Sequence, residues 1–153
     1  MTDNRHPSVY VAASNLLTAT YPNQVQQTLS YDGLNRITQS GAASRSYAYN
    51  RAVTGRVLSV GEVSGRIATY SYDSVLRLTN ETITADPAGK SGTLAYSLDA
   101  VTNRLSLTSA LSGFPSQTFT FNANDQTTGD IYDANGNVLA SGATATSGIS
   151  RTA

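Results

Sequence analysis

Large apolar side chains alternate with small, mostly polar ones in several short stretches of the chain. The alternating pairs are Leu29/Tyr31, Tyr47/Tyr49, Tyr70/Tyr72, Tyr96/Leu98 and Phe119/Phe121. This period of two predicts β-strands, because successive side chains of a strand point to opposite faces. We therefore expect strands that carry their aromatic and aliphatic side chains on one face.

Short polar segments follow these strands and predict turns. An Asp or Asn ends the strand, and its side chain can accept a backbone N–H from two residues further on. A Gly or Asn then tolerates a positive φ at Asn35, Gly55, Asn103 and Gly136, whereas Leu76 departs from this rule. An Arg followed by Leu, Ile or Val begins the next strand. Each unit thus predicts a β-hairpin, and the chain about five in a row with about ten strands.

The hairpin unit repeats along the chain. Tyr31-Asp32 precedes Arg36 with the same spacing as Tyr72-Asp73 precedes Arg77, and looser copies lie between and after them. The repeat residues in this alignment are Tyr31, Asp32, Arg36, Tyr49, Asn50, Arg56, Tyr72, Asp73, Arg77, Asp99, Arg104, Tyr132 and Asp133. Asp or Asn stands at residues 32, 50, 73, 99, 122 and 133, which gives a period of about 22 residues over the first four intervals.

The repeated Arg points to a role beyond the hairpin itself, because a hairpin needs no Arg. A planar guanidinium can donate to turn carbonyls or, with two parallel bonds, to the carboxylate of a neighbouring unit. We expect this structural role for the repeat arginines rather than contact with a ligand.

The composition supports an all-β fold and excludes several functions. The chain has 153 residues, of which 39% are hydrophobic and 13% charged, and it contains 19 Ser, 20 Thr, two Glu and one Lys. Helical bundles and coiled coils need more of the strong helix formers. Ten basic and ten acidic residues cancel, which argues against a nucleic-acid or anionic-membrane surface. No apolar stretch is long enough for a membrane-spanning helix, and no signal peptide is visible.

Few side chains offer catalytic or metal-binding chemistry. Cysteine is absent and His6 is the only histidine, so we expect no cofactor, no metal and no catalysis. Asp125, Asp130 and Asp133 lie close in sequence and are the one candidate for a weak cation site. The remaining candidate is a binding surface, since exposed rings of Tyr47, Tyr70 and Tyr96 could stack on a carbohydrate. The alternative is that these rings pack between hairpins.

The Tyr-Asp-x-x-Gly/Asn-Arg-Leu/Ile pattern resembles the YD repeat of the RHS (rearrangement hot spot) family over about three quarters of the chain. The resemblance implies a repetitive, spiralling or curled sheet of consecutive antiparallel hairpins, which in the family closes into a shell around a C-terminal toxin. It also implies an extracellular, secreted or cell-surface bacterial protein, and in some members carbohydrate binding. Residues 86–89, Asp-Pro-Ala-Gly, match the family's self-cleaving motif only superficially, and we expect an ordinary turn there.

These observations predict three segments and a structural function. Residues 1–24 form an N-terminal segment that is an extra strand or disordered, residues 25–139 the hairpin array, and residues 140–153 a low-complexity tail that can act as an edge strand. We expect a non-catalytic shell or scaffold wall whose partners are other YD-repeat units. One alternative is a self-assembling fibre or homo-oligomer in which residues 138–149 or 9–17 donate a strand, and another is an adhesin that binds glycans.

Overall fold

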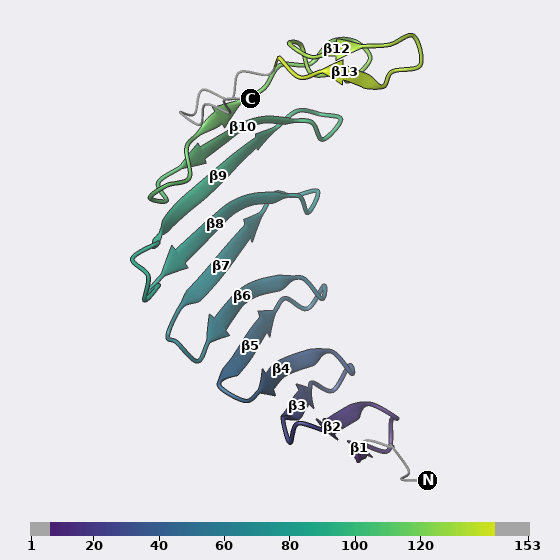
Figure 1. Cartoon of the computed structure of the whole chain (residues 1–153), viewed down its shortest axis with the longest axis vertical. Coiled ribbons are helices and arrows are strands. Elements are labelled where there is room, and N and C mark those ends of the chain that lie inside the picture. The colour runs from purple at the N-terminus through teal and green to yellow at the C-terminus, as the bar shows by residue number, and fades with distance from the viewer. Residues whose placement is uncertain (1–6, 143–153) are drawn as a thin grey trace. The chain divides into compact units, whose positions relative to one another are not determined.

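The computed structural model describes residues 7–142, and all regular structure within them is β-strand. The strands of the main sheet are β1 (Ser8–Tyr10), β2 (Leu16–Thr20), β3 (Gln26–Tyr31), β4 (Ile37–Ala42), β5 (Arg45–Arg51), β6 (Val57–Glu62), β7 (Ile67–Tyr72), β8 (Leu78–Thr84), β9 (Gly92–Leu98), β10 (Arg104–Ser109) and β11 (Gln117–Thr118). They follow one another in chain order, as the labels in Figure 1 show, and β12 (Ile131–Tyr132) and β13 (Val138–Ala140) form a separate two-stranded sheet. The predicted all-β fold of consecutive antiparallel hairpins is confirmed.

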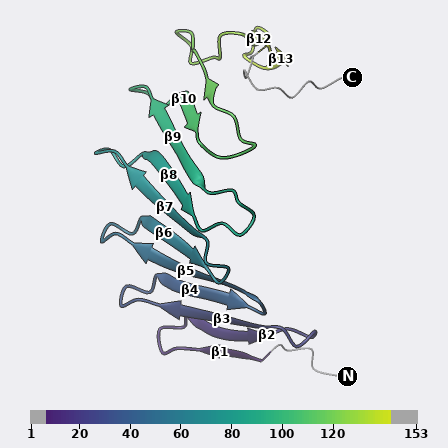
Figure 2. The same ribbon diagram turned by 90° about the vertical axis from the view of Figure 1, so that its left-hand side faces the viewer.

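The chain divides into two compact units. One runs to Tyr70 and includes Ile83–Ala88, and the other comprises Ser71–Thr82 and the residues from Gly89 on. In the first unit β1 to β6 each pair antiparallel with the next strand along the chain (Figure 2). In the second unit β9, β10 and β11 pair in the same way.

The strand register places large and small side chains on opposite faces. On one face of the first unit Val60 lies opposite both Tyr49 and Ala68, and Glu62 lies opposite Tyr47. On the other face most of the opposed residues are small: Gly41 lies between Thr28 and Ser46, and Gly61 lies between Ala48 and the larger Ile67. We call the first of these faces the tyrosine face. The Ser and Thr content of the chain is explained in part by the second face, on which short polar side chains leave the sheet surface open.

A β-bulge follows the turn in five of the hairpins, whereas the pairings β2–β3, β4–β5, β6–β7 and β10–β11 have a regular register. The pairing shifts between Ser30 and Tyr31 in one hairpin and between Asn50 and Arg51 in the next, and the hairpins β1–β2, β9–β10 and β12–β13 contain similar shifts. A bulge bends its strand and increases the local right-handed twist.

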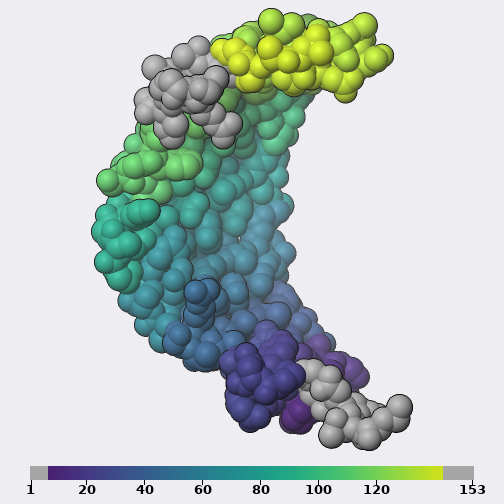
Figure 3. Space-filling model, viewed as in Figure 1, coloured from purple at the N-terminus to yellow at the C-terminus, as the bar shows by residue number. Residues whose placement is uncertain are grey.

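Within residues 7–142, neither unit contains a second layer that covers its sheet. The buried apolar residues are Ala19, Ala68, Ile83, Leu94 and Leu107, and no polar residue is buried in the described part of the chain. Hairpins of the first unit occupy successive bands of the surface, coloured purple to blue in Figure 3. A domain normally buries its sheet against another layer, so both sheets are unusually exposed.

The structure revises the predictions for the two ends of the chain. Residues 9–17 are not one free strand, because a turn at residues 11–15 separates β1 from β2. Val138–Ala140 is already paired with β12. Residues 1–6 and 143–153, which include His6 and most of the predicted C-terminal edge strand, lie outside the described residues.

Candidate interaction site: a ladder of turns and a tyrosine face

One five-residue turn recurs along the chain, and residues 32–36 illustrate it. The N–H of Asp32 (position 1) donates to the carbonyl of Arg36 (position 5), and the N–H of Asn35 (position 4) donates to the carbonyl of Asp32, both over 3.0 Å. Asn35 has a φ of 59°, in the left-handed region. A type I turn followed by a left-handed residue is a common connection of β-hairpins, because it fits the twist of the two strands.

The same two hydrogen bonds close turns at both ends of the strands and in the C-terminal segment. These turns begin at Val11, Tyr21, Asp32, Ala52, Glu62, Asp73, Asp99, Asn122 and Asp133. Each has a position 4 residue with positive φ, including Ser14, Leu76 and Thr102, which are not residues that favour it. The turn is therefore defined by its backbone and accepts several residues at every position.

This definition corrects the repeat alignment in two copies. Position 1 of the second copy is Ala52, whereas Asn50 lies within β5. Position 5 of the fourth copy is Asn103, whereas Arg104 lies in β10 with its guanidinium 4.9 Å from the Phe119 ring centroid. Position 1 does not need an acidic side chain, so the Tyr-Asn pair at residues 49–50 resembles the repeat in sequence although the turn begins at Ala52.

With this correction the period becomes more regular, and it extends towards the N-terminus. The turns within the hairpins β1–β2, β3–β4, β5–β6 and β7–β8 begin at residues 11, 32, 52 and 73, so they start 21, 20 and 21 residues apart. The first of them lies in residues 1–24, outside the predicted array. Tyr10 and Asn15, at the spacing of Tyr31 and Arg36, are the sequence signal that could have identified it.

The Asp at position 1 holds its own turn together. Asp32 Oδ1 accepts the N–H groups of Leu34 (2.9 Å) and Arg36 (3.0 Å), while Oδ2 accepts Arg36 Nε at 2.7 Å. Asp73 makes the same three contacts with Val75 and Arg77. In the turns that begin at Asp99 and Asp133, an Asn at position 5 replaces Arg and donates its side-chain amide to Oδ2, at 3.0 and 2.9 Å.

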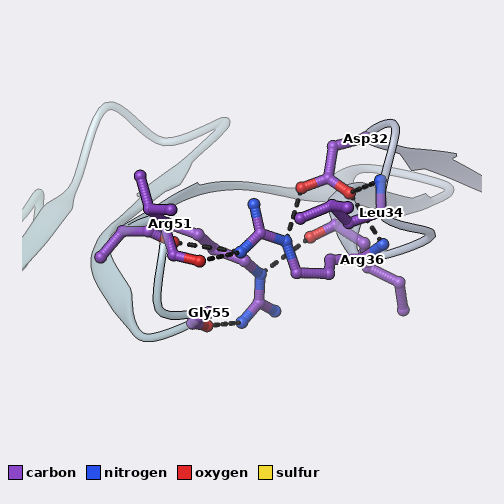
Figure 4. Close-up of polar contacts among 8 residues, drawn as sticks. Asp32, Leu34, Arg36, Arg51 and Gly55 are labelled. Atoms are coloured by element: carbon purple, nitrogen blue, oxygen red, sulfur yellow. Dashed lines mark hydrogen bonds and ion pairs between the residues drawn. The ribbon is translucent and has the colours of Figure 1, made fainter.

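Arg36 and Arg77, both at position 5, also join their turns to the next turn at the same end of the strands. Arg36 Nη1 donates to the carbonyl of Ala52 at 3.0 Å, and Arg51 reaches back, donating from Nε to the Ile37 carbonyl and from Nη1 to the Gly55 carbonyl (Figure 4). In the second unit Arg77 Nη1 donates to the carbonyl of Asp99 at 2.6 Å. We call this series of turns and links, within each unit, the turn ladder. Its arginines are bonded to protein groups, so the ladder holds neighbouring hairpins in register.

Acid is expected to destabilise the ladder. Backbone hydrogen bonds from Arg36 and Arg77 are the main reason why the pKa of Asp32 and of Asp73 lies below the usual 3.8. A carboxyl whose pKa is lowered by folding contributes stability that is complete above its unfolded pKa and is lost as the pH falls through the folded value. The melting temperature should therefore change little above about pH 5 and fall below pH 3.8, and Asp73→Asn should make this acid dependence shallower. A melting temperature independent of pH down to pH 2 would contradict this assignment.

Removal of a ladder arginine should lower stability. Arg36→Ala deletes the bonds to Asp32 and to the Ala52 carbonyl, and we expect a loss of roughly 1–3 kcal/mol in the free energy of unfolding measured with urea. The control is Arg45→Ala, which removes the same charge from an exposed position in β5 and should change stability by less than about 0.5 kcal/mol. If Arg36→Ala and Arg45→Ala lowered the free energy of unfolding equally, the stabilising role of the ladder arginine would be contradicted.

The tyrosine face has both packed and exposed rings. Tyr31 Oη donates to the Leu16 carbonyl at 2.8 Å, and the Arg51 guanidinium lies 5.6 Å from the Tyr49 ring centroid. In the second unit, burial raises the pKa of Tyr96, and the charge of Glu81 adds to this effect. Tyr47 is 36% exposed and borders an open hollow of about 380 Å³ that lies mainly on the opposite face, over Gly41 and Gly61. Tyr47 and Tyr70 belong to the first unit and Tyr96 belongs to the second. Carbohydrate contact by these three rings stays a prediction.

The remaining candidate sites do not form in the part of the chain that the structure describes. Asp125 accepts from Asn103, Asp130 from Ser141 and Asp133 from its own turn, and no group of three metal-binding side chains comes together in residues 7–142. Asp86 accepts the N–H of Ala88 at 2.8 Å, as in an ordinary turn. The same residues contain no helix long and apolar enough to cross a membrane.

Comparison with known proteins identifies relatives by fold alone. No family model and no curated protein sequence matches the chain. The crystal structure of TcdB2-TccC3-Cdc42 matches with a TM-score of 0.68 and 22% sequence identity over 78% of this chain. The crystal structure of TcdB2-TccC3-TEV matches with a TM-score of 0.66 and 20% identity over 82% of this chain. The structure of the Photorhabdus luminescens Tc holotoxin pore matches with a TM-score of 0.67 and 20% identity over 82% of this chain. The match covers only 6–7% of those chains. The chain thus has the fold of a small segment of these Tc toxin chains.

Proposed function

We propose that the chain is a non-catalytic wall segment of an RHS-like shell or scaffold. The observation that carries this proposal is the turn ladder, which fixes each hairpin on its neighbour although no second layer covers the sheet. Such an array extends by adding hairpins rather than by building a core around a site. The fold likeness to Tc toxin chains, of which this chain spans a small fraction, supports the same role.

The partners in this proposal are other YD-repeat units. The strands β1 and β11 stand at the two ends of the main sheet order, and an end strand presents unpaired N–H and C=O groups to a further strand. Large side chains such as Val9 and Tyr10 are more than half exposed beside that edge. By analogy with the Tc toxin structures the parent assembly is extracellular and bacterial.

The full chain in solution tests the proposal. A wall segment should bind a hydrophobic dye while it still gives a β-sheet circular dichroism spectrum, and its mass from light scattering should rise with concentration. A monomer at every concentration that excludes the dye would overturn the proposal, because a self-sufficient globular domain has those properties.

The fibre alternative makes a different prediction for the same samples. Its support is that β1 and β11 are unlike one another, so contact between copies is head-to-tail and continues without limit unless the rotation closes a ring. Electron microscopy should then show filaments that lengthen with concentration, whereas wall segments without their parent should form short, irregular oligomers. Binding to a glycan array that is lost in Tyr47→Ala would favour the carbohydrate-binding alternative.

A further inference from the structure

Turns that follow one another at the same end of the strands are joined by two kinds of hydrogen bond, one made by Arg and the other by Asn at position 5. In two of the turns with Arg at position 5, Nη1 reaches the main-chain carbonyl at position 1 of the next turn at that end. Arg36 reaches Ala52 at 3.0 Å and Arg77 reaches Asp99 at 2.6 Å. Every residue has a main-chain carbonyl, so this link places no demand on the side chains of the next turn.

Where position 5 is Asn, the link goes to a side chain instead. Asn15 Nδ2 donates to Asn35 Oδ1 at 2.8 Å, and Asn103 Nδ2 donates to Asp125 Oδ1 at 2.9 Å. Asn35 and Asp125 both occupy position 4 of the turn that follows. The Asn side chain is shorter than that of Arg, and its acceptor is a side-chain oxygen that projects from the next turn rather than a main-chain carbonyl of that turn.

Position 4 is an unusual place for such an acceptor, because its φ is positive. After the arginines Arg36 and Arg77, position 4 is Gly55 (φ 91°), which has no side chain, and Thr102 (φ 82°), whose hydroxyl is not the acceptor of the link. Asn and Asp are the residues other than Gly that most readily adopt the left-handed conformation. They are thus well suited to supply an oxygen at this position.

We propose that positions 5 and 4 of successive turns form a matched pair that determines which hairpin can follow which. An Asn at position 5 requires Asp or Asn at position 4 of the next turn, whereas an Arg at position 5 places no requirement there. The pairing within the chain holds whatever the function of the array. One extension rests on the proposed function: Asn137, at position 5 of the last described turn, selects as partner a hairpin with Asp or Asn at position 4.

A double-mutant cycle tests the pair in the second unit. Urea unfolding and amide hydrogen exchange at Asn103 and Gln126 are measured for the full chain, for Asn103→Ala, for Asp125→Ala and for the double variant. Asn103→Ala also removes the bond between Asn103 and Asp99, both with and without the Asp125 side chain, so the loss of this bond cancels in the coupling factor. We expect a coupling factor of about 2–5 in the opening equilibrium constant, the lower end of the range for side chains in direct contact.

Arg77 and Thr102 provide the matched control cycle. They occupy the same two positions, but Arg77 bonds the main chain, so Arg77→Ala and Thr102→Ala should combine additively, with a coupling factor near 1. Additivity at Asn103 and Asp125, or equal coupling in both cycles, would overturn the proposal.

Exchange of the link provides a second test. In the Asp125→Ala background, Asn103→Arg should recover much of the lost stability, because an Arg at position 5 can reach the main-chain carbonyl of Asn122. Failure of this rescue would contradict the proposal. If Asp125→Ala does not fold, nuclear magnetic resonance of the unmodified chain decides: the side-chain amide protons of Asn103 should exchange slowly, and exchange at the rate of a solvent-exposed Asn would overturn it.

Discussion

Leu107→Ala should be the most destabilising of the simple truncations, with an expected loss of about 2–3 kcal/mol in the free energy of unfolding. Leu107 is only 2% exposed and lies in β10 between Tyr96 of β9 and Gln117 of β11. Among the described residues only five apolar side chains are buried, so each of them contributes a large share of the apolar contact. Urea unfolding followed by circular dichroism measures the change.

Leu105→Ala is the control for this substitution. Leu105 lies in the same strand and loses the same atoms, but it is 36% exposed. We expect its truncation to cost less than about 1 kcal/mol. Equal losses at the two positions would mean that the burial of Leu107 does not stabilise the sheet.

Gly92→Ala should be the second most disruptive change. A Cβ atom at Gly92, the first residue of β9, would lie 2.6 Å from the carbonyl oxygen of Ala110 and 2.9 Å from its carbonyl carbon. Both are main-chain atoms, and the neighbouring Ala110 N–H is bonded to the Thr93 carbonyl at 2.8 Å, so the backbone cannot yield without loss of pairing. We expect a loss of about 1–3 kcal/mol, as for overpacked positions.

The matched glycine is Gly61, in β6. A Cβ there would meet no atom within 4 Å, and its φ is not positive. Gly61→Ala should therefore change the free energy of unfolding by less than about 0.5 kcal/mol, measured in the same way. A Gly92→Ala variant as stable as Gly61→Ala would contradict the close approach of β9 to residue 110.

The strands were predictable from the sequence because their alternation is strong. Pairs such as Tyr47/Tyr49 and Tyr70/Tyr72 have a clear period of two, and the Asp at positions 32 and 73 marks the following turn. The two standard copies, with Arg36 and Arg77, gave the hairpin and its spacing correctly. These features are local, so they can be read from neighbouring residues.

The turn frame and the ladder were less predictable, because the backbone defines them. Ala52 and Val11 occupy position 1 without an acidic side chain, and Leu76 and Thr102 adopt a positive φ that their residue types disfavour. The links of the ladder join residues about 16–22 apart, such as Arg36 to Ala52 and Arg77 to Asp99. No pattern within one repeat shows which carbonyl of the next repeat a guanidinium will reach.

Hydrogen–deuterium exchange of the full chain over a range of concentrations tests the central claim most directly. A wall segment pairs through its ends, so amides of β1 and β11 should become protected as the concentration rises, while those of interior strands such as β5 stay protected throughout. Exchange in β1 and β11 that does not change with concentration and is as slow as in β5 would contradict the claim, because the sheet would then be complete without further repeats.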